Sequence, residues 1–260
     1  LRNSSAASDV YKRQDLGIKF SYQWTTCDKY GFIKTSSIKN LNNEDISVTF
    51  LDGIQNILPW GLDEGIQNNT SNLADAYKRN ELDRNSKIGI FALSATIVDR
   101  AEPSEALKSN VVFHLGLKEN KILLSSLQLD KFRKGFNVVE ETDVKAEKGA
   151  YFIQSFLTLK SGQKEDWVLA ADISKSSTDI LKLKNDLSVS KNIINDINQE
   201  ILKSSNELYK LVASSDGIQL SNDRRRNIRH FANTLFNIMR GGIFDKDYIV
   251  AVSYTHLRAH

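Results

Sequence analysis

The stretch GIKFSYQW (17–24) decides the fold class of this chain. Apolar and polar residues alternate along it, with Ile18, Phe20 and Tyr22 set against Lys19, Ser21 and Gln23. A period of two is typical of a strand with one face in a core and the other in water. The sequence therefore predicts β-structure at this end of the chain.

Working outward, further strand-like segments are separated by polar turns. They are 31–38, 46–51, 88–98, 111–115, 122–126, 149–159 and 166–173. The block 52–70 predicts an irregular loop, 73–82 is ambiguous between a short helix and a strand, and 127–133 favours a helical turn. Eight or so antiparallel strands with polar loops indicate a large β-sandwich.

The pattern changes character at Ser174. Apolar residues then recur every three or four positions along 180–187, 193–211 and 228–239, which predicts helices. Gly241 and Gly242 predict the end of the last helix. The fold class expected from the residues is therefore α+β, a large antiparallel β-sandwich followed by helices.

Both ends of the sequence resemble translated sequencing adapter. Residues 4–14 read SSAASDVYKRQ, the translation of a transposase-type adapter, and 252–260 read VSYTHLRAH, the translation of its reverse complement. We therefore expect 1–14 and 252–260 to be artefacts and set them aside from fold reasoning. On this expectation, 15–251 is a piece of a longer protein.

Setting these ends aside removes the basic bias of the whole chain, whose formal net charge is +3. Four basic residues and one acidic residue fall in the two ends, so the interior is neutral and nucleic acid is not an expected partner. His256 and His260 have metal-ligand spacing but lie in the expected artefact, so neither a metal nor a cofactor is expected. The single Cys27 excludes an internal disulfide. No apolar run is long enough to span a bilayer, so no membrane is expected as a partner.

Two loops and a helix end carry the candidate substrate-binding residues. In VDRAEPSEAL (98–107), the charged cluster could bind sugar hydroxyls, or form an ion-paired loop that stiffens a strand connection; its members are Asp99, Arg100, Glu102 and Glu105. In LPWGLDE (58–64), the indole of Trp60 could stack on a pyranose, or plug the end of the sandwich. Arg240 is a further candidate, or part of an ordinary helix stop.

The remaining motifs favour structural roles. The run Arg224–Arg226 begins a helix, where cations oppose the dipole, and is interpreted as a solvated face or a contact with an acidic domain. Phosphate binding is the alternative for this run. His114 and His230 are interpreted as packed or capped. The sequence has no phosphate loop, metal-ligand spacing, nucleophile elbow or distinct carboxylate pair in its interior, so no catalytic residue is predicted.

The order of elements resembles the front half of cellobiose-phosphorylase-like glycoside hydrolases and phosphorylases of bacteria. The segments that carry the resemblance are YGFIKTSSIKN (30–40), LDGIQNILPWG (51–61), LADAYKRNELD (73–83), DRAEPSEAL (99–107) and RHFANTLFNIMRGGIF (229–244). The resemblance implies a galactose-mutarotase-like supersandwich over 15–174 and a helical linker over 175–220. It also implies the first helix of a truncated (α/α)6 barrel over 221–251. The family's catalytic carboxylate has no counterpart here.

The resemblance implies that the chain is a non-catalytic N-terminal portion of a carbohydrate-active enzyme, inactive by itself. Such a portion braces the catalytic barrel and supplies a loop to the substrate pocket. The expected partners are its own missing barrel, an oligo- or polysaccharide bound by the full-length protein, and a second copy in a homodimer. A carbohydrate-binding or structural sandwich with a helical tail stays open as an alternative. A self-contained hydrolase is disfavoured because the sequence shows no set of catalytic residues. Cellular location is left open, with the cytoplasm favoured.

Overall fold

The computed structural model describes residues 7–13, 16–97, 104–118, 120–189 and 192–241. Over these residues the chain is α+β, with antiparallel sheets and six helices, as the sequence predicts. It divides into two compact units, Leu1–Ile201 and Leu202–His260. The division falls inside the helix α5, Ile193–Ser214.

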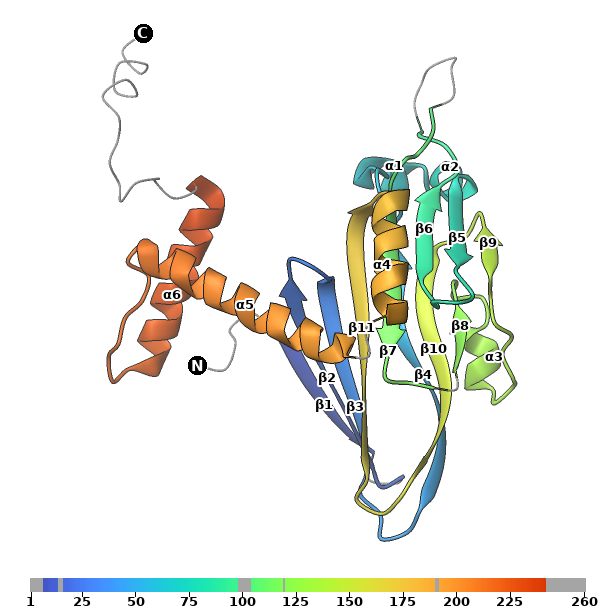
Figure 1. The fold of residues 1–260 in the computed structure, drawn as a ribbon, viewed down its shortest axis with the longest axis horizontal. Coiled ribbons are helices and arrows are strands. Elements are labelled where there is room, and N and C mark those ends of the chain that lie inside the picture. The colour runs from blue at the N-terminus through green and yellow to red at the C-terminus, as the bar shows by residue number, and fades with distance from the viewer. Residues whose placement is uncertain (1–6, 14–15, 98–103, 119, 190–191, 242–260) are drawn as a thin grey trace. The chain divides into compact units, whose positions relative to one another are not determined.

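The larger sheet has eight strands in the order β1-β2-β3-β11-β7-β6-β5-β9 (Figure 1). Their bounds are β1 Ala7–Arg13, β2 Ile18–Cys27, β3 Gly31–Asn40, β5 Lys78–Leu82, β6 Gly89–Leu93, β7 Ser109–Leu115, β9 Asp143–Lys145 and β11 Lys164–Lys175. Every neighbouring pair is antiparallel. β11, which comes last in the sequence, lies between β3 and β7 and pairs with both.

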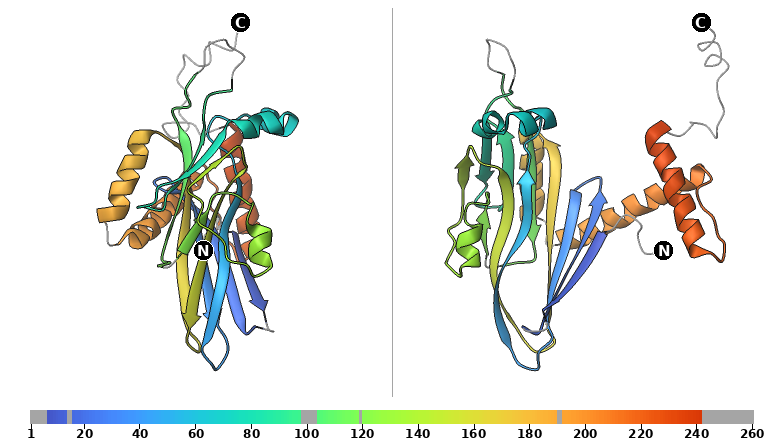
Figure 2. Two further views of the ribbon diagram at one scale, coloured as in Figure 1. Left: turned by 90° about the vertical axis from the view of Figure 1, so that its right-hand side faces the viewer. Right: turned by 180° about the vertical axis from the view of Figure 1, so that it is seen from behind.

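The smaller sheet has three strands in the order β4-β10-β8 and packs face to face with the larger sheet (Figure 2). Its strands are β4 Ile46–Ile57, β8 Asn120–Leu123 and β10 Gly149–Leu159. The short connections β3–β4 and β10–β11 are two of the places where the chain crosses from one sheet to the other. The predicted sandwich is therefore present, although its second sheet covers only part of the first.

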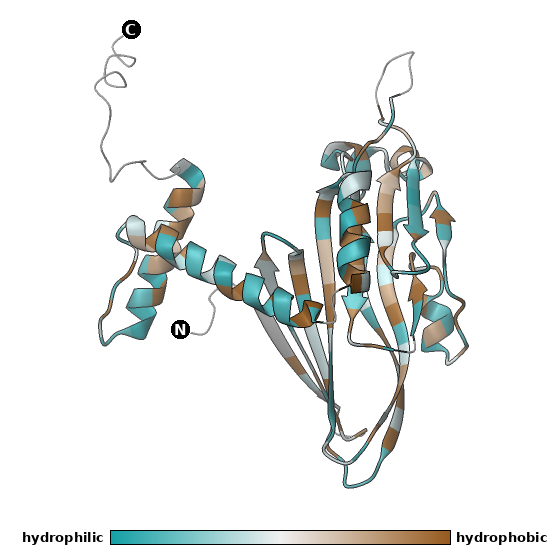
Figure 3. Ribbon diagram, in the orientation of Figure 1, coloured by the Kyte–Doolittle hydropathy of each residue, from teal (hydrophilic) through white to brown (hydrophobic). Residues whose placement is uncertain are grey.

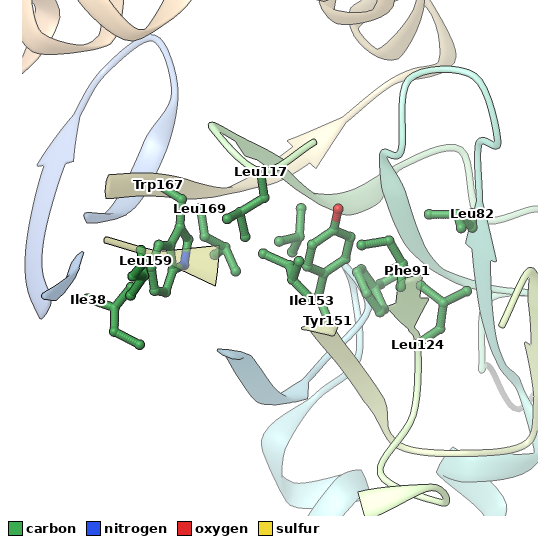
Figure 4. Packing of buried hydrophobic residues seen from close by; sticks show 12 residues of the cluster. Ile38, Leu82, Phe91, Leu117, Leu124, Tyr151, Ile153, Leu159, Trp167 and Leu169 are labelled. Atoms are coloured by element: carbon green, nitrogen blue, oxygen red, sulfur yellow. The ribbon is translucent and has the colours of Figure 1, made fainter. Parts of the chain in front are cut away.

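The main core lies between the two sheets (Figure 4). Trp167 and Leu169 of β11 meet Tyr151 and Ile153 of β10, and Phe91 of β6 closes the cluster. Successive side chains of a strand point to opposite faces, so these alternate residues all reach one interior. Ile18 and Phe20, two of the alternating residues at the start of the chain, pack against the same cluster.

A short helix explains why β10 is apolar on both faces. α3, Leu129–Arg133, covers the outer side of the smaller sheet, where Phe132 and Leu129 pack on Phe152 and Ala150. A strand that is covered on both sides needs no polar face and reads as a continuous apolar run. The unbroken burial at the beginning of β10 follows from this arrangement.

Two further helices cover the outer face of the larger sheet. They are α4 Ser177–Val189 and α5 Ile193–Ser214. The residues Ile193, Ile197 and Ile201, spaced by four, are buried against Ile33 and Phe113 of the sheet. This spacing places them on one side of the helix, so the first part of α5 belongs to the same core as the strands.

Carboxylates fasten both helices to the sheet. Asp83, in the turn after β5, accepts a hydrogen bond from Lys184 of α4 and others from Ser86. Burial alone would raise the pKa of Asp83, but these hydrogen bonds outweigh it and lower the pKa to about 2. In α5, Asp196 Oδ2 accepts from Lys29 Nζ and Tyr30 Oη, both at 2.6 Å. The bond from Lys29 is the main reason that the pKa of Asp196 is lowered.

The segment 52–70 differs from the irregular loop that the sequence predicts. β4 continues to Ile57 because β10 pairs with it from Ile46 to Gln55 and again at Ile57, with a bulge at Asn56, whose φ is 57°. The helix α1, Glu64–Asn69, then begins behind Asp63, whose side chain accepts from Ile66 N. The ambiguous stretch after it contains the short helix α2, Ser71–Ala76, and then β5.

Part of the expected N-terminal artefact has regular structure. Ala7–Arg13 form the edge strand β1, which pairs with β2 over seven residues. Tyr11 lies beside Tyr22 with a centroid distance of 6.3 Å, and Val10 and Tyr11 are exposed. The hydrogen bonds between an edge strand and its neighbour are made by the main chain. Many different sequences could therefore pair with β2 at this edge of the sheet.

In the second compact unit, α6 spans Arg224–Gly241. Its arginine-rich start is capped by Asp223, whose Oδ1 accepts from Arg225 N at 3.0 Å and Arg226 N at 3.1 Å. The carboxylate supplies the negative charge that a helix N-terminus favours, and thereby offsets the arginines. His230 Nε2 lies 2.9 Å from the carbonyl oxygen of Asp216, which fits its predicted structural role.

Candidate functional site

An open pocket lies on the sandwich beside the loop that connects β4 to α1. Its volume is about 320 Å³. The lining residues are Trp60, Gly61, Leu93, Thr96, Glu105, Ala106, Leu107 and Lys108. Both α1 and α2 lie at this end of the sheets (Figure 1). The pocket therefore combines Trp60 with residues of the loop 98–107 and with Thr96 and Lys108, which lie on either side of that loop.

The indole of Trp60 is held in a partly open position. The residue is 40% exposed, and Lys108 Nζ lies over its ring at 5.6 Å from the centroid. The same ammonium donates to Ser174 Oγ at 3.1 Å. A cation fixed over one aromatic ring restrains both side chains, so the indole is held before any ligand arrives.

The backbone that carries Trp60 is anchored on both sides. Asn110 Nδ2 donates to Leu58 O at 2.7 Å, and Asn110 Oδ1 accepts from Ser174 N at 3.1 Å. Gly61 turns the chain with a φ of 81°, a conformation that glycine adopts without strain. Asp63 then caps α1. The loop is therefore tied to β7 and to the irregular end of β11, where pairing with β7 shifts register.

The opposite wall of the pocket is built by the two ends of the loop after β6. Thr96 N donates to Ser104 O at 2.7 Å, and Thr96 Oγ1 donates to Glu105 O at 3.3 Å. Leu93, at the end of β6, is buried, whereas Glu105 and Leu107 are exposed. The wall thus presents an apolar surface with one hydroxyl and one carboxylate beside it.

Two of the five residues predicted for the site lie within the described residues. Trp60 lines the pocket, whereas Asp99, Arg100 and Glu102 lie outside the described residues. Arg240 is in α6, in the other compact unit, with its guanidinium carbon 5.6 Å from the centroid of the Phe236 ring. A role in substrate binding stays a prediction for all five residues.

Three of the lining residues lie outside both loops that the sequence selected, namely Leu93, Thr96 and Lys108. Thr96 and Lys108 flank the loop 98–107 that the sequence selected for its charges. The hydrogen bond from Thr96 N to Ser104 O joins the two ends of this loop and brings the residues beside it together. The position of the loop in the sequence could therefore have indicated these lining residues. Leu93 could not be predicted as a lining residue, because its sequence context indicates only a strand.

The pocket contains groups that can bind a ligand by stacking and by hydrogen bonds, from Trp60, Thr96, Glu105 and Lys108. Among the lining residues that the structure describes, Glu105 is the one carboxylate. Within the described part of the chain, no group of three or more His, Cys, Asp and Glu side chains could hold a metal ion. Over the same residues, no helix is long and apolar enough to cross a membrane.

Away from the pocket, a buried polar cluster joins the two sheets. Asp52 of β4 accepts from Ser36 Oγ at 3.0 Å and Trp167 Nε1 at 2.8 Å, and forms an ion pair with Lys34. Lys34 Nζ also reaches Gly53 O at 3.4 Å and lies 5.1 Å from the centroid of the Tyr22 ring. All of these groups are satisfied within the protein, so the cluster serves the fold and leaves no group free for a ligand.

A second cluster involves His114 of β7. Its Nδ1 lies 2.8 Å from Tyr151 Oη, which itself donates to Lys87 O at 2.6 Å. Because the tyrosine proton is used on Lys87, His114 Nδ1 carries the proton donated to Tyr151. Burial lowers the pKa of His114 to about 4, with a smaller effect from the charge of Lys87. Burial also raises the pKa of Tyr151. This histidine is therefore neutral and packed at neutral pH.

No protein-family model matches the chain, and no curated protein matches it. Among solved structures, it is similar to a protein described as a candidate kojibiose phosphorylase from the human microbiome. The identity is 12% and the TM-score is 0.48. The match covers 91% of this chain and 27% of that protein, so the chain spans about a quarter of its length.

Proposed function

We propose that this chain is the non-catalytic N-terminal portion of a carbohydrate-active enzyme, a glycoside phosphorylase or hydrolase. In this proposal the sandwich is of the galactose-mutarotase-like kind, α4 and α5 are linker helices, and α6 is the first helix of an (α/α)6 barrel. The portion braces the barrel, and the Trp60 loop contributes to carbohydrate binding.

The observation that carries this proposal is the apolar stripe of α6. Apolar residues recur along the helix at intervals of three and four (Figure 3). Within the described residues, none of α6 is buried, and Ile228, Phe236 and Met239 are exposed. An amphipathic helix gains most of its stability by burying such a stripe against other elements. Further helices of the barrel would provide that cover.

Two other features support the proposal. The order of sandwich, paired helices and amphipathic helix is the order that the resemblance implies. Among the described residues that line the pocket, Glu105 is the one carboxylate, whereas glycoside hydrolysis uses a pair, which is in keeping with a catalytic centre on another part of the enzyme.

The proposal is tested on the native gene and on its full-length product. We expect the gene to continue beyond position 251 with helical hairpins enough to complete a six-hairpin barrel. Amide exchange should be fast along α6 in the chain alone and slow in the full-length protein, because the stripe becomes buried. A stop codon soon after position 251 would refute the proposal, as would fast exchange of α6 in the full-length protein.

Activity gives a separate check. The chain alone should neither hydrolyse nor phosphorolyse oligosaccharides, whereas the full-length protein should do one or the other. Turnover by the chain alone that disappears on changing a residue within 15–251 would overturn the non-catalytic role.

A second candidate function is a carbohydrate-binding sandwich with a helical tail and no barrel. The Trp60 pocket favours it, because that site is built within the first compact unit. The two candidates differ in the fate of α6, which stays exposed in the second and becomes covered in the first.

A further inference from the structure

The shape of the Trp60 pocket limits what it can hold. Its volume of about 320 Å³ lies at the lower end of the range of about 300–1,000 Å³ seen for small-molecule sites. The partly exposed indole and three apolar neighbours, Leu93, Ala106 and Leu107, line it. A small ligand with one flat, weakly polar face fits such a surface.

The polar groups of the pocket limit the charge of the ligand. Among the lining residues that the structure describes, Glu105 supplies a carboxylate, Lys108 an ammonium and Thr96 a hydroxyl. The carboxylate and the ammonium have opposite signs, so neither an anion nor a cation is attracted by both. The same three groups can donate and accept hydrogen bonds to hydroxyls. This combination favours a neutral ligand rich in hydroxyl groups.

The pocket is organised before binding. Lys108 is held by Ser174 Oγ and by the indole, and the Trp60 loop is tied down through Asn110. The two ends of the loop after β6 are joined by the hydrogen bond from Thr96 N to Ser104 O. A ligand therefore orders few groups when it binds, which lowers the entropic cost of association.

We propose that this pocket binds one end of a neutral saccharide, with a pyranose ring stacked on Trp60 and its hydroxyls bonded by Glu105, Lys108 and Thr96. The choice of saccharides rests on the proposed function, which this inference deepens by locating a sugar site on the sandwich. The site acts by binding, and no bond of the sugar is broken there.

The test uses the whole chain and ligand-observed NMR with methyl β-glucopyranoside, maltose and cellobiose as probes. We expect saturation transfer to the sugar ring protons with at least one of these probes. Trp60→Ala should weaken that binding about tenfold or more, and Trp60→Phe should weaken it less because a ring remains. Glu105→Gln should weaken it while leaving the indole in place.

Two controls make the result specific. Phe32→Ala removes another exposed aromatic residue, one outside the pocket lining, and should leave saccharide binding unchanged. Inorganic phosphate should not displace the sugar. Near-ultraviolet circular dichroism of each variant confirms that the sandwich is folded, and Glu105→Gln provides an answer if Trp60→Ala does not fold.

Three results would overturn the inference. The first is that the folded chain binds no saccharide. The second is that Trp60→Ala and Glu105→Gln bind the saccharide as strongly as the unchanged chain does, and the third is that phosphate displaces the saccharide. Failure here leaves the proposed function standing if the native gene continues into a barrel. Conversely, if the native gene ends soon after α6, the proposed function fails but the inference of a sugar site on the sandwich still stands.

Discussion

Lys34 and Asp52 form an ion pair across the inside of the sandwich, between β3 of the larger sheet and β4 of the smaller one. Their side chains are 8% and 9% exposed, so water screens the pair weakly. Because Ser36 and Trp167 donate to the same carboxylate, the pair is the centre of a polar link through an otherwise apolar core.

Replacing one partner of this pair should be strongly destabilising. Lys34→Met leaves the buried carboxylate of Asp52 without its cation, and we expect the free energy of unfolding to fall by about 3–5 kcal/mol. The double variant Lys34→Met with Asp52→Leu removes both charges and should recover part of that loss. Urea denaturation of the three proteins measures the difference.

Lys164→Met serves as the matched control for Lys34→Met. Lys164 pairs with Asp166 at 2.6 Å, but both side chains are exposed, so the loss should stay below about 1 kcal/mol. Equal losses in the two single variants would show that the buried pair contributes no more than a surface pair.

The stability of the sandwich should fall as the pH drops from about 6.5 to 4. The pKa of His114 is about 4 in the folded protein and near its ordinary 6.5 when unfolded. Between these values the unfolded chain binds more protons, so stability is full above pH 6.5 and declines until the folded histidine also titrates. The loss from this group is at most about 3 kcal/mol.

His114→Asn checks the origin of that slope. The asparagine amide can still donate to Tyr151 Oη but does not titrate, so the unfolding free energy should vary less between pH 6.5 and 4. Urea midpoints at pH 7, 5.5 and 4.5 provide the comparison. An equally steep decline in the variant would contradict the assignment to His114.

Two substitutions on α5 should separate a docked helix from a loose tail. Ile197 is 1% exposed, and Ile197→Ala should cost about 2–4 kcal/mol, whereas Leu202→Ala at a site 53% exposed should stay within about 0.5 kcal/mol. Denaturant unfolding gives the costs, and amide exchange along 193–201 shows whether the helix start remains docked. Small and equal costs would favour the tail.

Removal of residues 1–14 should leave the fold intact. The described side chains of β1, Val10 and Tyr11, are exposed and belong to none of the three buried clusters, and the strand contributes edge pairing and the contact between Tyr11 and Tyr22. The shortened chain should keep its far-ultraviolet circular dichroism spectrum, with a midpoint slightly lower because β2 loses a neighbour. Loss of cooperative unfolding would show that this segment belongs to the fold.

Much of the sandwich could be predicted because each strand carries its pattern locally. The alternation at 17–24 and the apolar run at 149–159 both lie within strands that the structure confirms. The end of β4 could not be predicted, since Gly53, Gln55 and Asn56 read as turn residues. Pairing with β10 overrides that local preference, and the pairing is not visible in the segment itself.

The pocket was partly predictable for the same reason. Trp60 was found because an aromatic residue in a polar loop is a local signal. Lys108 was not, because its contact with the indole depends on Ser174 and on the bond between Thr96 and Ser104, which join separate segments. Short-range patterns contain no information about which loops meet.

The place of β11 between β3 and β7 has a consequence for how the protein is made. A ribosome synthesises β3 and β7 well before residues 164–175, and until these emerge both strands lack their shared neighbour. Pairing such as Trp167 with Ser36 must then close a long stretch of chain, which makes folding slow. The nascent chain therefore exposes an open edge on both strands from the completion of β7 at Leu115 until β11 begins at Lys164, and open strand edges are prone to aggregation.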